Sequence, residues 1–428
     1  MRGSIKRLLS VATVFLIAAG TLVIAEAPAM AATCDTPWSA TTAYTGGAKV
    51  SKSGVNYTAN WWTQGDDPAT QSGGAGSGKP WTSTGACTGG GTGGGGGTGG
   101  GGTGGGGTGT VSGMLFSPYK DITVNLNWNT NQMRTAATGQ VIPVVGASNS
   151  LVSSALPNLG AITLAFATGT CGSESWGGVS KDAFVAANIP QLDSAGLNYV
   201  VSTGGAAGSF KCATGDALKA FIATYATPHL VGIDFDIESG QSVADVQALV
   251  NAAAAAQSTY PKLRFSFTLA TLAASDGSYG GLNSTGDAVV KAIKASTLTN
   301  YTINLMTMDF GRATAANCVL KGATCDMGAS TIQAAVNLKH TYAIPYSKVE
   351  LTPMIGVNDT SDEVFTLADV DTVTAWAVQN GIAGLHHWSL DRDTPCASPQ
   401  STASPICSSV SGSTPLQWTK RFLSDLGR

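Results

Sequence analysis

The ten residues from Leu230 to Ser239 constrain the fold of this chain more than any other stretch. They read LVGIDFDIES, so that Asp234, Asp236 and Glu238 alternate with apolar residues. A period of two is typical of a β-strand, on which residues i, i+2 and i+4 share one face. The three carboxyl groups are therefore expected in a row, about 6.5–7 Å apart. Mutual repulsion would hold at least one proton on this row, which is what a general acid needs.

Two other interpretations of the acidic row are a metal site and a solvated edge strand. An EF-hand places its acids in a loop with glycine at the sixth position, whereas this row lies in a continuous β-run. Distant residues could still complete a metal site. An exposed edge strand would be less apolar than the residues from Leu230 to Ile237. Catalysis is the favoured interpretation.

The stretch GIDFDIE resembles the DGxDxDxE signature of glycoside hydrolase family 18, the chitinases and related endo-N-acetylglucosaminidases. The match includes Gly232 and the three acids, and it departs at Val231, where the family has aspartate. The resemblance implies substrate-assisted catalysis without a cofactor. In that scheme Glu238 protonates the leaving oxygen and then activates water, Asp236 orients the acetamido group, and Asp234 tunes Asp236. Neighbouring charges are expected to raise the pKa of Glu238, so that it is protonated while Asp236 is charged.

From residue 112 to residue 428, strand patterns alternate with helical patterns. Eight such units in this length fit a (β/α)8 TIM barrel, an α/β fold whose active site lies at the C-terminal ends of the strands. The acidic row would be the fourth strand, with Glu238 at the rim. The expected strands are Asp121–Leu126, Ala161–Ala167, Tyr199–Ser202, Leu230–Glu238, Arg264–Leu269, Thr302–Thr307, Lys348–Met354 and Gly384–Trp388. The expected helices are Lys181–Ala195, Asp216–Tyr225, Val243–Ser258, Asp287–Ala295 and Ala329–Thr341.

Two shorter motifs fall where a family 18 barrel would place them. Residues 202–205, STGG, resemble the SxGG motif that ends the third strand, and the glycines would let the chain turn tightly beside the fourth strand. Residues 306–309, MTMD, resemble the MxYD motif of the sixth strand. Met308 replaces the tyrosine that contacts the N-acetyl group, and Asp309 matches. Both are expected at the substrate.

The segment GLHHWSLD near the C-terminus resembles the last strand of the family. Its tryptophan floors the central sugar site, and here that residue is Trp388. His386 and His387 in the same segment are expected to be packing or loop groups rather than catalysts. Tyr119, in the stretch FSPYKD of the first strand, either lines the cleft or belongs to the core. Trp176 is a candidate for a further sugar subsite.

A compact aromatic-rich unit is expected from Cys34 to Cys87. Short strand patterns separated by turns indicate an all-β fold, and so small a unit needs a disulfide to close it. The pattern PW…AYTGGAKVSKSGVNYTANWWTQGDDP…GKPW…GAC resembles the carbohydrate-binding modules of families 5 and 12, which bind chitin and cellulose. Trp61 and Trp62 are expected to bind sugar rings by stacking, with Tyr44 as a third candidate. Alternation along a strand could instead bury one of the two tryptophans.

The N-terminus has the layout of a secretory signal, with basic residues, an apolar run and the cleavage site Ala29-Met30-Ala31. An uncleaved anchor is the alternative. All eight cysteines follow this segment, and an even number in an exported chain implies disulfides. The pairing stays open, and pairing between nearest neighbours in the sequence is the simplest arrangement. The glycine- and threonine-rich stretch that follows Cys87 is expected to be a flexible tether.

The nearly balanced charge, 23 basic against 26 acidic residues, gives no indication of nucleic-acid or membrane partners. The expected order is a signal peptide at 1–31, a chitin-binding module at 34–87, a linker at 88–111 and a catalytic barrel at 112–428. The resemblances imply a chitinase that acts on chitin and chitooligosaccharides. The layout of the N-terminus implies that it is secreted, and a monomer is expected. The alternatives are a non-hydrolytic, lectin-like chitin-binding protein and an endo-β-N-acetylglucosaminidase that acts on N-glycans.

Overall fold

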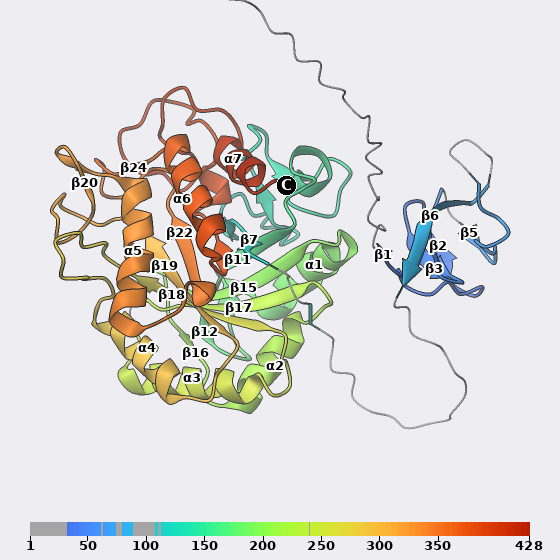
Figure 1. The fold of residues 1–428 in the computed structure, drawn as a ribbon, viewed down its shortest axis with the longest axis horizontal. Coiled ribbons are helices and arrows are strands. Elements are labelled where there is room, and N and C mark those ends of the chain that lie inside the picture. The colour runs from blue at the N-terminus through green and yellow to red at the C-terminus, as the bar shows by residue number, and fades with distance from the viewer. Residues whose placement is uncertain (1–31, 61–62, 74–78, 89–107, 110–112, 239) are drawn as a thin grey trace, which may run out of the picture. The chain divides into compact units, whose positions relative to one another are not determined.

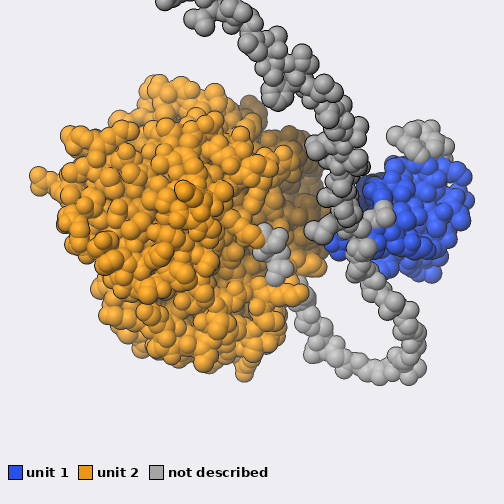
Figure 2. Space-filling model, in the orientation of Figure 1, with its two compact units in different colours: residues 1–102 blue, residues 103–428 orange. Residues whose placement is uncertain are grey.

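The computed structural model describes residues 32–60, 63–73, 79–88, 108–109, 113–238 and 240–428. The chain divides into two compact units, residues 1–102 and residues 103–428 (Figure 2). Each unit has a hydrophobic core of its own. The expected signal peptide and most of the expected linker lie outside the described residues. In the part of the chain that is described, no helix is long and apolar enough to cross a membrane.

The first unit is a small all-β fold (Figure 1). One sheet has the strand order β1-β6-β4-β3, and β2 pairs with β5. A disulfide between Cys34 and Cys87 closes the unit, as its small core requires. Its strands are β1 (Ala32–Thr33), β2 (Ala43–Tyr44), β3 (Lys49–Lys52), β4 (Val55–Ala59), β5 (Thr63–Gln64) and β6 (Trp81–Thr88). Its buried core consists of Val50, Tyr57, Ala59 and Trp81.

The second unit is a (β/α)8 barrel whose first strand is split in two. The sheet runs β7-β25-β22-β19-β18-β17-β15-β11-β8. β7 (Leu115–Phe116) and β8 (Tyr119–Asp121) are separated only by Ser117 and Pro118. β7 pairs with β25, the last strand of the chain, and β8 pairs with β11. The split first strand therefore closes the barrel.

The remaining barrel strands are parallel, and the helices lie around their outside (Figure 1). The strands are β11 (Ala161–Ala167), β15 (Asn198–Gly204), β17 (Leu230–Asp236), β18 (Arg264–Ala270), β19 (Tyr301–Thr307), β22 (Val349–Pro353) and β25 (Gly384–Leu385). The helices are α1 (Lys181–Ser194), α2 (Gly215–Tyr225), α3 (Val243–Ala256), α4 (Ser284–Ala295), α5 (Met327–Tyr342), α6 (Leu367–Asn380) and α7 (Gln417–Asp425).

Local sequence explains where several of these elements begin. β17 is buried at every position, as expected for a barrel strand that is covered on both faces. Ser242 and Asp245 form a reciprocal capping box at the start of α3, and Thr366 and Asp369 form another at the start of α6. Each box satisfies backbone N–H groups that the first helical turn leaves free. Burial therefore fixes the fourth barrel strand in the core, and a capping box fixes the start of the helix that follows it.

The prediction of a first strand at Asp121–Leu126 is wrong. The first barrel strand lies earlier in the chain, as β7 and β8. The side chain of Asp121 accepts hydrogen bonds from the backbone N–H and the hydroxyl of Thr123, and this local turn ends β8. No α-helix lies in residues 122–160, all of which are described. This connection contains β9 (Arg134–Thr135), β10 (Ile142–Pro143) and one π-helical turn (Leu151–Ala155). The structure also contains helices α6 and α7, which the sequence patterns do not predict.

Short strands lie in several loops of the barrel, and three disulfides join loop residues. Bonds between nearest neighbours join Cys171 to Cys212, Cys318 to Cys325 and Cys396 to Cys407, which confirms the simplest pairing. The loop strands are β12 (Gly169–Thr170), β13 (Ser175–Trp176), β14 (Val179–Ser180), β16 (Phe210–Lys211), β20 (Leu320–Lys321), β21 (Thr324–Cys325), β23 (Gly356–Val357) and β24 (Val364–Phe365).

Candidate active site

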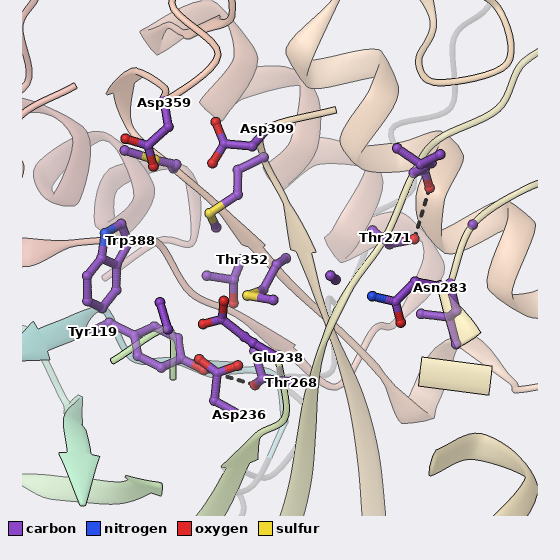
Figure 3. Close-up of a pocket in the computed structure, with 18 of the residues that line it drawn as sticks. Tyr119, Asp236, Glu238, Thr268, Thr271, Asn283, Asp309, Thr352, Asp359 and Trp388 are labelled. Carbon is purple, nitrogen blue, oxygen red and sulfur yellow. Dashed lines mark hydrogen bonds between the residues drawn. The ribbon is translucent and has the colours of Figure 1, made fainter. Parts of the chain in front are cut away.

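A pocket of about 650 Å³ opens at the C-terminal ends of the barrel strands. Figure 3 shows Tyr119 and Trp388 together on one side of it, with Asp236 and Glu238 next to them and Asn283 on the opposite side. The pocket is lined by side chains from β8, β11, β17, β18, β19 and β22 and from the segment after β25. This is the position expected for the active site of a (β/α)8 barrel.

Asp234 lies buried beneath the pocket and is saturated with hydrogen-bond donors. Its Oδ1 accepts from Ser266 Oγ and Thr268 Oγ1, both at 2.7 Å. Its Oδ2 accepts from Ser202 Oγ at 2.5 Å and from Tyr119 Oη at 3.0 Å. Burial raises the pKa of Asp234, although each of the four hydrogen bonds lowers it. No acceptor position on this carboxylate is left for a substrate.

Asp236 has the opposite surroundings. It is only 6 % exposed, and its Oδ1 has no hydrogen-bond partner among the described residues. Burial raises the pKa of Asp236 well above its usual range, and the charges of Glu238 and Asp234 raise it further. Glu238 follows at the rim, half-buried, and burial raises its pKa as well. Asp236 and Glu238, which we call the acid pair, therefore hold a proton at higher pH than isolated carboxyl groups would.

The cause of the raised pKa of Glu238 differs from the sequence-based expectation. That expectation gave Glu238 the proton, held by neighbouring charges, and left Asp236 charged. In the structure burial is the cause of the raised pKa of Glu238. Asp236 is more deeply buried, and its pKa is raised first by burial and then by the charges of Glu238 and Asp234.

The backbone beside Asp236 is packed closely against the neighbouring strand. Gly204, at the end of β15, has a positive φ of 89°. A Cβ atom at this position would lie 2.1 Å from the carbonyl oxygen of Asp236. Only glycine fits there, which confirms that the STGG motif lets the chain turn tightly beside the acidic strand.

Trp388, Phe166 and Tyr119 form an aromatic wall of the pocket. The rings of Trp388 and Phe166 stack with centroids 5.6 Å apart, and that of Tyr119 lies 6.1 Å from each of them. Tyr119 is buried and also lines the pocket, so it is both a core residue and a wall residue. Trp388 lines the pocket as expected, whereas Phe166 was not singled out from the sequence.

Met308 and Asp309 follow β19 and line the pocket, and Asp309 lies close to Asp359 (Figure 3). The carboxylate of Asp309 accepts a hydrogen bond from the backbone N–H of Thr360 at 2.9 Å. Burial raises the pKa of Asp309. Contact of Met308 and Asp309 with a substrate stays a prediction.

Trp176 is not a sugar subsite, and this expectation is wrong. Its side chain is completely buried, stacks on Phe184 with ring centroids 4.1 Å apart and donates to Tyr225 Oη at 3.0 Å. The glycine-rich loop around it suggested exposure, but the loop folds back on helices α1 and α2. A buried indole that is paired in this way has no face for a ligand.

His386 and His387 are both buried, as expected of packing groups. The ring of His387 lies against Phe422 with centroids 5.7 Å apart, and its Nε2 is hydrogen-bonded to Thr419 Oγ1. Burial lowers the pKa of His387 to about 3, so that it stays neutral. Neither histidine lines the pocket.

Of the candidate binding residues in the first unit, Trp61 and Trp62 lie outside the described residues. Tyr44 is half-buried, with its ring edge-on to Trp81 at 5.3 Å. Its Oη accepts a hydrogen bond from the backbone N–H of Ser39 at 2.7 Å. The role of all three in binding chitin stays a prediction.

The hydroxyls around Asp234 were missed, although the sequence carries a signal for them. β18 reads RFSFTLA, in which Ser266 and Thr268 alternate with apolar residues on a buried strand. Polar groups at every second position of such a strand indicate a polar inner face. Asn304 of β19 and Thr352 of β22 follow the same rule.

The pocket offers carboxyl, hydroxyl and aromatic groups rather than a ligand set for a metal. Among the described residues, no group of three or more histidine, cysteine, aspartate or glutamate side chains is arranged to hold a metal ion. What the site offers chemically is a proton donor at its rim, an acceptor that lacks a donor, and an aromatic wall.

Comparison with known proteins agrees with both units. Residues 37–82 match carbohydrate-binding module family 5/12, which confirms the resemblance drawn from the aromatic pattern. The chain is 28 % identical over 227 residues to a probable bifunctional chitinase/lysozyme from Escherichia coli K12, covering 48 % of this chain and 24 % of that protein. It is 29 % identical over 125 residues to endochitinase 11 from Metarhizium anisopliae, covering 27 % and 23 %. The chain thus spans about a quarter of the length of the curated relatives it matches.

Two solved structures share the barrel. The catalytic domain of a hyperthermophilic chitinase from Pyrococcus furiosus has a TM-score of 0.54 and 24 % identity, covering 74 % of this chain and 96 % of that one. Catalytic-site mutants of active domain 2 of the thermostable chitinase from this organism, complexed with chito-oligosaccharides, give 0.54 and 23 % over the same shares. The barrel has the fold of a chitinase catalytic domain.

Proposed function

We propose that this protein is a secreted chitinase that hydrolyses β-1,4-linked N-acetylglucosamine polymers by substrate-assisted, retaining catalysis. One observation carries the proposal: Asp236 is buried beside the rim acid Glu238 and has an oxygen without a donor. A buried acceptor that lacks a partner costs about 1–3 kcal/mol. The N–H of a 2-acetamido group would supply that partner, whereas glucose has no such group.

The proton of the acid pair would move when the substrate binds. A hydrogen bond from the acetamido N–H to Asp236 stabilises the charged form of that carboxyl. The shared proton then passes to Glu238, which protonates the leaving oxygen and later acts as base on the incoming water. The acetamido oxygen attacks the anomeric carbon, and ionised Asp236 stabilises the positive charge of the cyclic intermediate. The four donors of Asp234 oppose the effect of burial by lowering its pKa, which favours keeping the proton on the pair.

Other features support a neutral, insoluble polymer as substrate. The aromatic wall that contains Trp388 provides a face for an uncharged sugar ring. The match of residues 37–82 to family 5/12 supports chitin binding by the first unit, and its tether would keep the barrel at high local concentration near the polymer. The disulfides of both units support export through the predicted signal peptide. We further propose that the enzyme acts as a monomer.

The experiment is reducing-end release by the purified protein from colloidal chitin and, in parallel, from phosphoric-acid-swollen cellulose. The two polymers share the β-1,4 linkage and differ at carbon 2. Release from chitin alone is expected, since cellulose lacks the internal nucleophile and the donor for Asp236. Comparable release from both would contradict the assisted mechanism. No release from either, with chitin still bound, would leave a non-hydrolytic binding protein.

A further inference from the structure

A chain of buried polar side chains crosses the barrel at the base of the pocket, and three of its four members line the pocket. Thr352 Oγ1 on β22 donates to Asn304 Oδ1 on β19 at 2.8 Å. Asn304 Nδ2 in turn donates to Tyr119 Oη and to Thr268 Oγ1, both at 2.9 Å. All four side chains are at most 3 % exposed. Because these side chains are buried, each of their polar hydrogens needs a hydrogen-bond acceptor on a neighbouring side chain.

The amide of Asn304 sets the direction of these hydrogen bonds. An amide N–H can only donate, and a hydroxyl has a single proton. Since Tyr119 and Thr268 both accept from Asn304, neither can donate to it. Each hydroxyl donates to Asp234, 3.0 Å and 2.7 Å away, which is nearer than the 3.2 Å between the two hydroxyl oxygens. Thr352 fixes the amide in this orientation, because its hydroxyl proton meets the amide oxygen.

The directed donors fill the acceptor positions of Asp234. Two come from Tyr119 and Thr268, and two from Ser202 and Ser266, which matches the four positions of an ionised carboxylate. A proton on Asp234 would displace one donor into the buried interior, where it would have to find another partner. Protonation of Asp234 is therefore opposed for as long as the amide of Asn304 keeps the hydroxyls turned towards it.

We infer that Asn304 is a positioning residue, which acts through two hydroxyls to keep Asp234 ionised and the catalytic proton on the acid pair. The inference rests on the proposed function and adds to it a residue outside every motif noted in the sequence. Asn304 itself does not line the pocket.

Other titratable groups face Asp234 and must be considered in its titration. Tyr119 approaches from β8, and the acid pair lies further along its own strand. Arg264, Glu350 and His386 line a small cavity of about 10 Å³ together with Asp234. Arg264 is ion-paired with Glu350, and the test leaves both of these residues in place.

The test compares wild type with the variant Asn304→Leu combined with Thr352→Val, which removes the amide without leaving the threonine hydroxyl unpaired. Two quantities are measured: the kcat/KM–pH profile on chitooligosaccharides, and the carboxyl ¹³C titration of aspartate-labelled protein without ligand. The Asp234 signal is assigned by its loss in Asp234→Asn. Freed hydroxyls can turn to each other, since Tyr119 Oη and Thr268 Oγ1 lie 3.2 Å apart. The pKa of Asp234 and the acidic limb of the profile should rise together, by about one pH unit.

The matched control is Asn188→Leu, which removes another buried asparagine that hydrogen-bonds Met133 N and the carbonyls of Asn131 and Phe184. It should lower the stability of the protein without changing the pKa of Asp234 or the acidic limb of the kcat/KM–pH profile. If the double variant does not fold, Thr352→Val alone should give a smaller shift of the same sign, because the amide can then rotate. A variant that is slower at every pH, with Asp234 titrating as in wild type, overturns the inference. A wild type that does not cleave chitin refutes the proposed function, and the ¹³C titration still decides the role of Asn304.

Discussion

The two ends of the barrel treat buried carboxyl groups in opposite ways. At the N-terminal end, Glu350 on β22 is ion-paired with Arg264 at the start of β18, and His386 Nε2 lies 3.5 Å away. Burial alone would raise the pKa of Glu350, but Arg264 and His386 lower it to about 2. At the C-terminal end, Asp236 is buried with no cation beside it among the described residues, and its pKa is raised.

The difference teaches that burial does not by itself make a catalytic acid. A buried carboxyl that meets a cation is held ionised and contributes to the fold, whereas one that meets other carboxyls holds a proton that it can pass on. One barrel supplies both environments, because its two ends are lined by different residues of the same strands. The N-terminal end is accordingly expected to respond to substitution in stability and the C-terminal end in turnover.

The largest effect on stability is expected from Arg264→Met, which leaves Glu350 buried without its main partner. The free energy of unfolding should fall by about 3 kcal/mol at pH 7, with His386 compensating in part. In wild type, the pKa of Glu350 lies below its ordinary value of 4.5, so this stability is present above pH 4.5 and is lost as the pH falls towards 2. Urea unfolding at pH 7 and pH 3 measures both effects.

The matched control is Lys219→Met, which removes an exposed ion pair with Asp216 and should cost less than about 1 kcal/mol. Turnover of the folded Arg264→Met protein on soluble chitooligosaccharides should stay within a few-fold of wild type. A large loss of turnover in the folded Arg264→Met protein would contradict the expectation that the N-terminal end of the barrel affects stability rather than catalysis.

A smaller effect on the free energy of unfolding is expected from Glu363→Gln. Glu363 is buried like Asp236 but does not belong to the acid pair. Burial and the charge of Asp309 raise its pKa to about 7. The native state then binds a proton that the unfolded chain releases, so wild-type stability falls as the pH rises from about 4.5 to about 7. The variant should be more stable than wild type by about 1–2 kcal/mol at pH 8 and equal to it at pH 4. Equal pH dependence of urea unfolding in both proteins would contradict this account.

The smallest effect is expected from deletion of residues 34–87, which removes the first unit and leaves both ends of the barrel intact. Release from insoluble chitin should fall on the order of fivefold, because the tethered module raises the local concentration of the barrel. Cleavage of soluble chitooligosaccharides should be unchanged. Equal losses on both substrates would mean that the first unit affects the activity of the barrel itself, rather than its local concentration near the insoluble polymer.

The acidic strand could be predicted from the sequence because alternation alone decides which side chains share a face. Trp388 could be placed because a short motif fixes its position at the end of the last strand. The surroundings of Asp234 could not be predicted. They consist of the hydroxyls of Tyr119, Ser202, Ser266 and Thr268, which three other strands bring to Asp234 across long stretches of sequence.

Loop residues show a second limit of the sequence. Trp176 lies in a stretch rich in glycine, and its composition gives no sign that the indole is covered by Phe184 and Tyr225. The first strand was placed too late because Asp121 and the apolar residues after it fit a strand pattern. Only the hydrogen bonds from Thr123 to the Asp121 side chain show that the strand ends there.

The most direct test of the central claim measures turnover and the free energy of unfolding for Glu238→Gln beside Glu350→Gln. Glu238→Gln should lose turnover on chitooligosaccharides by a factor of about 10³ and keep wild-type stability, since it removes only the proton donor at the rim. Glu350→Gln should lose stability and keep turnover near wild type in the folded protein, because it leaves Arg264 unpaired. Full turnover in Glu238→Gln would contradict the assignment of the acid and with it the contrast between the two ends.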